Sequence, residues 1–160
     1  MAGTGPGGPQ WVTREDLRTR RTSQPGPGRP SWCYGTPGLA RAQQLAGLTT
    51  GDTTRQDTAE HALVGCLSDP AQLARVADTS LCHGWAGLFQ IAWRAAQDAR
   101  TPALAGCLPD MTGLLTQHAH PGTGDGTGLL EGDAGLALTL HTAACGIPPE
   151  SGWDACLLLS

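Results

Sequence analysis

The sequence predicts an all-α fold built from repeated helical hairpins. Two ten-residue segments, SWCYGTPGLA from Ser31 and SLCHGWAGLF from Ser80, align on their glycines, and GLLEGDAGLA later repeats the same frame. We call these segments cassettes. Their first aligned glycine recurs after 49 residues, from Gly35 to Gly84, and then after 48 residues, at Gly132. This period is long enough for one pair of helices with its connections.

The chain before the first cassette is predicted to hold little regular structure. Residues 1–10 are rich in Gly and Pro, and we expect them to be disordered. The following TREDLRTR is expected to form a short helical turn. The segment QPGPGRP, from Gln24 to Pro30, contains three prolines and two glycines and is therefore predicted to be a loop.

A helix is predicted directly after each cassette. Pro37 suits the first turn of the first helix, and the paired glycines permit a tight turn and close packing of neighbouring backbones. The segments GLARAQQLA, GLFQIAWRAA and GLALTLHTAA that follow are rich in Ala and Leu. We expect these three helices to be buried on all sides, and we therefore call them the inner helices.

Amphipathic helices are predicted between the inner ones. In the first, Arg55, Asp57 and Glu60 face away from an apolar stripe at helical spacing. The stripe consists of Ala59, Ala62, Leu63, Cys66 and Leu67.

A second outer helix is predicted from Thr101, with Pro102 in its first turn, to Gln117, with a kink or break at Pro109. Residues 118–128 are then a loop. Inner and outer helices together predict a curved double layer with the cassettes along one rim.

Charge and composition exclude several classes of function. The chain of 160 residues has ten basic residues, all Arg, and a formal net charge of −4, which excludes nucleic acid as the main ligand. No apolar export signal is found near Met1, and no run approaches the about 18 apolar residues that span a membrane. We expect a cytoplasmic protein without a membrane span. In a reducing compartment its six cysteines favour metal binding or catalysis over cross-links.

The cassettes carry the elements of a zinc site. Alignment places Cys33 on Cys82, and His83 follows directly. Zinc prefers thiolate and imidazole ligands, and a catalytic zinc site has three protein ligands and one open position. The sequence therefore predicts one Zn²⁺ bound by these three residues. Two thiolates and a neutral imidazole cancel the charge of Zn²⁺, which favours thiol alkylation or addition over hydrolysis.

The motifs WCYGTPG, LCHGWAG and GLLEGDAG, in this order and spacing, resemble the lanthionine synthetase C-like cyclases from about Trp11 to the terminal WDACLLL. The resemblance implies a double-layered α/α toroid of six or seven hairpins, of which this chain holds about three. We therefore expect a partial α/α toroid in which residues 11–160 form the C-terminal portion of the domain, as a fragment of a longer protein. Its exposed apolar flanks predict oligomerisation or poor solubility.

The resemblance also implies an activity, namely zinc-dependent addition of a peptide cysteine to dehydroalanine or dehydrobutyrine. Cys33, Cys82 and His83 match the zinc ligands of the family in order. Arg29 and Tyr34 match positions beside the zinc, where they would assist proton transfer or stabilise the developing enolate. A further acid–base His and an Asp, which the family places in earlier hairpins, have no counterpart.

Two alternatives remain open at this point. One is a catalytically incomplete zinc- and peptide-binding fragment, or half of a split protein, and the other is a closed structural zinc site completed by another Cys. The expected partners are a dehydrated precursor peptide or a small thiol, and a polypeptide that supplies the missing hairpins.

The remaining chemically active residues are expected to have other roles. Glu131 replaces His83 in the third cassette and is expected on the same rim, where it would contact the substrate or support the site. The other thiols are expected in the core or at the surface, and the other histidines in a solvated loop or on helices. They are Cys66, Cys107, Cys145 and Cys156, and His61, His118, His120 and His141.

Overall fold

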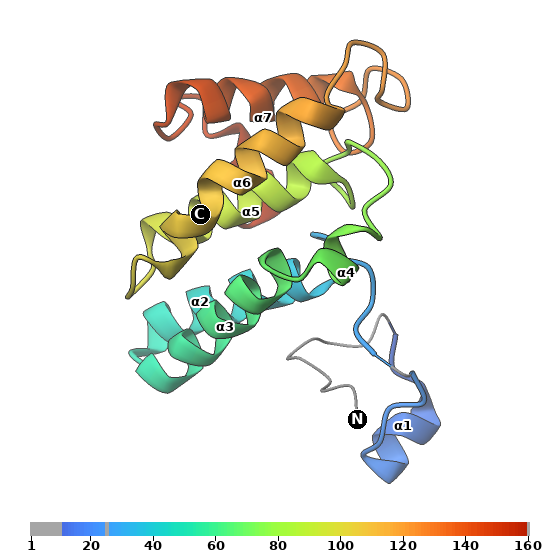
Figure 1. The fold of residues 1–160 in the computed structure, drawn as a ribbon. Coiled ribbons are helices and arrows are strands. Elements are labelled where there is room, and N and C mark those ends of the chain that lie inside the picture. Colours follow the sequence, from blue (N-terminus) through green and yellow to red (C-terminus); the bar gives the residue numbers. More distant parts are fainter. Residues whose placement is uncertain (1–10, 25, 160) are drawn as a thin grey trace.

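The computed structural model describes residues 11–24 and 26–159, which form helices and loops and contain no strand (Figure 1). The all-α prediction is confirmed. The elements are α1 (Arg14–Thr19), α2 (Thr36–Thr50), α3 (Thr53–Leu67), α4 (Pro70–Leu73), α5 (Trp85–Gln97), α6 (Ala103–His118), α7 (Asp133–Cys145) and the 3-10 helix η1 (Trp153–Leu157).

The helices are arranged as stacked hairpins in two layers. α2 packs on α3 and α5 packs on α6, while α5 lies between α2 and α7. The outer helices α3 and α6 also contact each other. Figure 1 shows the α2/α3 hairpin at one end, the α5/α6 hairpin in the middle and α7 at the other end. This is the predicted partial α/α toroid, with α2, α5 and α7 as its inner helices.

Each inner helix begins at a cassette, as predicted. The N-cap residues of α2, α5 and α7 are the aligned glycines Gly35, Gly84 and Gly132. The second aligned glycine of each cassette packs against a backbone carbonyl of its own turn, and a Cβ atom there would clash with that oxygen. These pairs are Gly38 with Trp32, Gly87 with Leu81, and Gly135 with Leu129.

Burial of the inner helices differs from the expectation. α5 is buried on nearly every side, but α2 and α7 are not, so the prediction of all-round burial is wrong for these two. α5 has an inner helix on each side, whereas α2 and α7 each have one on one side only. The aligned residues Leu88 and Leu39 differ accordingly, since Leu88 in α5 is fully buried and Leu39 in α2 is 49% exposed.

The outer helices follow the predicted pattern with two corrections. Most of the apolar stripe of α3 is buried, but Glu60, expected on the outer face, is buried too. Its carboxylate accepts hydrogen bonds from the side-chain amides of Gln44 and Gln56, which satisfies the buried charge. α6 starts two residues later than predicted and runs unbroken through Pro109.

The N-terminal segment contains the predicted short helix. Thr13 and Asp16 form a reciprocal capping box at the start of α1, in which each side chain accepts a hydrogen bond from the other residue's backbone N–H. The predicted disorder of residues 1–10 lies outside the described residues.

The C-terminal segment after α7 lies against the inner helices. The indole N–H of Trp32 donates to the carbonyl of Leu157 at 2.9 Å, and the buried guanidinium of Arg41 donates to the carbonyl of Leu159. In the described part of the chain, no helix combines the length and the apolar character needed to cross a membrane.

Candidate metal centre

A repeated pair of backbone hydrogen bonds joins the three cassettes. The N–H groups of Trp32 and Cys33 both donate to the carbonyl oxygen of Cys82, at 3.1 and 3.3 Å. One cassette further on, the N–H groups of Leu81 and Cys82 both donate to the carbonyl oxygen of Leu130, at 2.9 and 3.1 Å. The donors of the two pairs occupy equivalent positions in their cassettes, and the acceptors Cys82 and Leu130 also occupy equivalent positions. This ladder holds the three turns side by side at the starts of the inner helices.

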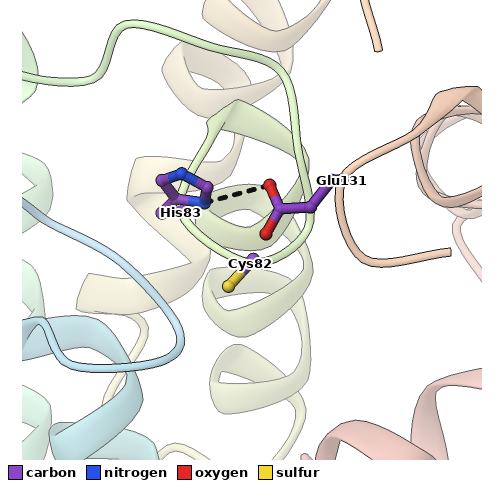
Figure 2. Close-up of side chains that lie close together, drawn as sticks. All are labelled: Cys82, His83 and Glu131. Atoms are coloured by element: carbon purple, nitrogen blue, oxygen red, sulfur yellow. Dashed lines mark ion pairs between the residues drawn. The ribbon is translucent and has the colours of Figure 1, made fainter. Parts of the chain in front are cut away.

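The ladder brings three metal-binding side chains together. One ligand atom each from Cys82, His83 and Glu131 lies within 4.8 Å of the other two (Figure 2). Cys82 and His83 come from the turn before α5, and Glu131 reaches toward them from the turn before α7. His83 Nδ1 is 3.3 Å from the nearer carboxylate oxygen of Glu131.

The remaining predicted ligand lies at the edge of this group. Cys33 is outside the set of mutually close atoms, but it is near enough to Cys82 to raise the pKa of that thiol. The side chain of Cys33 is exposed. The structure therefore places the two predicted cysteines on neighbouring turns joined by backbone hydrogen bonds, and it groups His83 and Glu131 with Cys82.

The Cys82 thiol lies in surroundings that disfavour a bare negative charge. Burial raises its pKa to about 12, and the nearby side chains of Cys33 and Glu131 act in the same direction. At neutral pH this sulfur is protonated unless a cation replaces the proton. A cation bound to this sulfur would replace its proton and favour the thiolate.

Arg29 and Tyr34 are connected to His83 through Asp78. The Arg29 guanidinium donates to the Tyr34 hydroxyl at 2.7 Å and forms an ion pair with Asp78 at 3.5 Å. The same Asp78 oxygen is 3.7 Å from His83 Nε2. A carboxylate on the outer nitrogen of a metal-binding imidazole fixes the orientation of the ring. Asp78 therefore connects the Arg29–Tyr34 pair to the candidate ligand His83.

Two cavities adjoin the centre. A polar cavity of about 230 Å³ contacts His83, Glu131 and Asp78, together with loop residues Thr123 and Asp125. A more apolar groove of about 320 Å³ runs along Cys33 between α2 and the C-terminal segment 157–159. The centre is thus accessible from solvent on two sides.

Sequence reasoning did not place Asp78 at the centre, and it left the role of Glu131 open. Both residues stand at aligned positions, because Asp78 precedes Cys82 by the same four residues as Arg29 precedes Cys33, and Glu131 aligns with His83. This alignment is the one feature of the sequence that could have indicated that the two residues lie at the centre. The described residues that form the close group include none of Cys66, Cys107, Cys145 and Cys156.

Several of the other candidate residues have local partners, as His118 and Cys66 illustrate. His118 stacks on the Trp85 ring, with 4.9 Å between the ring centroids. Cys66 is fully buried and its thiol donates to the side-chain oxygen of Gln72. Neither residue belongs to the close group around Cys82.

The fold and the centre define a helical-hairpin protein of the α/α type with a sulfur- and imidazole-containing candidate metal site. Residues 6–158 match the sequence profile described as lanthionine synthetase C-like protein, and the chain belongs to that family. A solved structure named nisin cyclase is similar, with 25% sequence identity and a TM-score of 0.75. The match covers 91% of this chain and 36% of that one. None of the curated proteins compared with this chain matches it significantly.

Proposed function

We propose that this chain acts as a zinc-dependent lanthionine cyclase, of which residues 11–160 form the C-terminal portion. The reaction adds a cysteine thiolate of a peptide to dehydroalanine or dehydrobutyrine in the same peptide. The observation that carries the proposal is that backbone hydrogen bonds hold the turn of Cys33 beside the turn of Cys82 and His83, in a chain of the lanthionine synthetase C-like family.

The residues at the centre fit a zinc ion. Thiolates and imidazole are the ligands that zinc prefers, and Cys33, Cys82 and His83 supply three of them. When bound, the ion would hold the substrate sulfur as a thiolate that remains nucleophilic. The ladder positions the ligands through the backbone, because the same turn that carries Cys33 donates to the carbonyl of Cys82.

Arg29 and Tyr34 are the proposed residues for handling the proton and the developing negative charge. Their side chains are hydrogen-bonded to each other, so the guanidinium keeps the phenol hydroxyl oriented. A positioned hydroxyl next to a cation can deliver a proton to, or stabilise, an enolate-like oxygen. The ion pair of Arg29 with Asp78 keeps this pair beside His83.

A second candidate function is binding of zinc and peptide without turnover. It is favoured by one observation, which is that the chain spans only 36% of the similar solved structure. In that case another polypeptide would supply the further hairpins and the acid–base residues they carry. A small thiol is the alternative substrate to a dehydrated precursor peptide.

The decisive experiment measures metal and turnover in the same preparation. Elemental analysis of the purified chain should give one zinc, and incubation with a dehydrated peptide containing one Cys should consume its free thiol. Cys33→Ala should lower both zinc content and cyclisation, whereas the exposed Cys156→Ala should change neither. Zinc binding without thiol consumption would support the binding function, and turnover that survives Cys33→Ala would exclude the zinc–thiolate mechanism.

A further inference from the structure

The backbone at Glu131 is held next to the turn of Cys82 by hydrogen bonds. The residue before it, Leu130, accepts both hydrogen bonds of the second step of the ladder, from Leu81 and Cys82. The carbonyl of Glu131 itself accepts a hydrogen bond from Asp125 at 2.9 Å. The carboxylate therefore projects from a turn that is anchored on both sides.

The separation between Glu131 and His83 is that of two ligands on one ion. In a tetrahedral zinc site with metal–ligand bonds of 2.0–2.1 Å, two nitrogen or oxygen ligands lie about 3.3–3.4 Å apart. The measured distance from His83 Nδ1 to the Glu131 oxygen is 3.3 Å. The same nitrogen also lies 3.2 Å from the hydroxyl oxygen of Ser80, so Glu131 and Ser80 both face Nδ1.

The second carboxylate near His83 is already engaged elsewhere. Asp78 accepts a hydrogen bond from the backbone N–H of Ser80 at 2.9 Å and pairs with Arg29. It faces Nε2, the opposite nitrogen of the ring from the one that faces Glu131. Among the described residues, His83 is the one ion-pair partner of Glu131. The two carboxylates thus have separate positions, one behind the imidazole and one on the side of Cys82.

We propose that Glu131 is a fourth protein ligand of the metal, which occupies the remaining position until a thiol displaces it. This inference rests on the function proposed above, because it needs the ion bound by Cys33, Cys82 and His83. A carboxylate is a harder ligand than a thiolate, and zinc binds thiolate well, so an incoming thiol can take its place. In that exchange the bond from metal to the Glu131 oxygen breaks, the bond to sulfur forms, and the proton of the thiol passes to the buffer.

The consequence for function is selectivity at the open position. With Glu131 bound, water and weak oxygen ligands must compete with a tethered carboxylate, whereas a thiolate displaces it. The side chain is 44% exposed, so it can swing into solvent without disturbing the core.

The test uses cobalt(II) in place of zinc, because its visible bands report coordination number and its near-ultraviolet bands report bound thiolates. Glu131→Ala and Glu131→Gln should change the visible spectrum and weaken zinc binding, measured by chelator competition, by about 10- to 100-fold. Asp125→Asn, which removes another carboxylate of the same cavity, should leave both unchanged. A small thiol such as glutathione should bind to the cobalt form of Glu131→Ala at about tenfold lower concentration than to the parent chain.

Glu131→Cys tests the proposal by an increase in the sulfur-to-cobalt absorption bands, which an unfolded variant would not produce. If residue 131 binds the ion, the sulfur-to-cobalt bands should rise by roughly half, because three thiolates replace two. Metal binding by the parent chain with identical cobalt spectra in all Glu131 variants would overturn the proposal and leave the proposed function intact. An unchanged spectrum with weaker affinity would likewise overturn it and make Glu131 a residue that only orients His83. Failure of the parent chain to bind metal would refute the proposed function itself.

Discussion

Arg94 and Asp154 form a two-pronged ion pair, in which the guanidinium donates to both carboxylate oxygens at 2.6 and 2.7 Å. Asp154 is fully buried and also accepts a hydrogen bond from Gln90 at 2.6 Å. This contact ties the C-terminal segment to the central inner helix α5. Because removal of one partner leaves the other charge buried, the pair is sensitive to substitution even though its net contribution is small.

Asp154→Asn should lower the free energy of unfolding at neutral pH by about 3 kcal/mol, since Arg94 would lose its partner. Urea denaturation measures this value. Asp57→Asn is the matched control, because Asp57 pairs with Arg100 at 2.7 Å in an exposed position. An exposed pair contributes at most about 1 kcal/mol, so an equal loss in the two variants would contradict the prediction.

The same ion pair predicts a pH dependence. Burial on its own raises the pKa of Asp154, but its bonds with Arg94 and Gln90 outweigh this and leave the pKa below its usual value. A lowered folded-state pKa contributes stability that is present above the unfolded-state pKa of about 3.9 and is lost as the pH falls through the folded-state value. The stability difference between the parent chain and Asp154→Asn should therefore shrink below about pH 4. A constant difference at every pH would show that the charge is not responsible.

Gly87→Ala should destabilise the chain, because a Cβ atom at this position would clash with the carbonyl oxygen of Leu81. We expect a loss of about 2 kcal/mol or more, the range of a steric clash in a packed core. Gly106→Ala is the control, since Gly106 lies in α6 with nothing within 4 Å of an added Cβ. Its replacement should stabilise the helix by about 0.5–1 kcal/mol. Equal thermal midpoints for the two variants would mean that the cassette turn can adjust.

Tyr34→Phe should slow cyclisation and leave the zinc content unchanged. The substitution removes the hydroxyl that Arg29 holds at 2.7 Å but keeps the ring. Loss of a positioned proton donor costs about 100-fold or more in rate. Zinc content and turnover are measured together, and a parallel loss of both would assign Tyr34 to the architecture of the site instead.

Removal of the metal should expose two thiols to reagents. In the zinc-loaded chain Cys33 and Cys82 should be protected from a colorimetric thiol reagent, and a chelator should release them. The exposed Cys145 and Cys156 should react at the same rate before and after removal. Release of three thiols would instead indicate a site closed by another cysteine.

The cassettes and the inner helices were predictable from sequence because their determinants are local and repeated. Gly84 and Gly87 fix a turn and a close approach within a few residues, and the same pattern occurs at Gly35 and Gly132. The resulting prediction of three helix starts on one rim is confirmed by α2, α5 and α7.

What could not be predicted depends on contacts between residues far apart in the chain. Glu60 looked like a surface charge, but Gln44 of the facing helix and the backbone of Arg100 give it partners in the interior. The contact of Asp154 with Arg94 likewise joins segments that no helical period relates. For Asp78 only the alignment with Arg29 pointed to the centre, and that alignment says nothing about distance.

The ladder of backbone hydrogen bonds links ion binding to the way neighbouring hairpins are held together. Cys33 belongs to the unit that begins with α2, whereas Cys82 and His83 belong to the unit that begins with α5. An ion bound by ligands from both units would cross-link them, and its binding free energy would oppose their separation. Removal of the ion by a chelator would then weaken the contact between neighbouring hairpins before either hairpin unfolds. Amide hydrogen exchange should therefore accelerate first at Trp32 and Cys33, whose N–H groups bridge the two units.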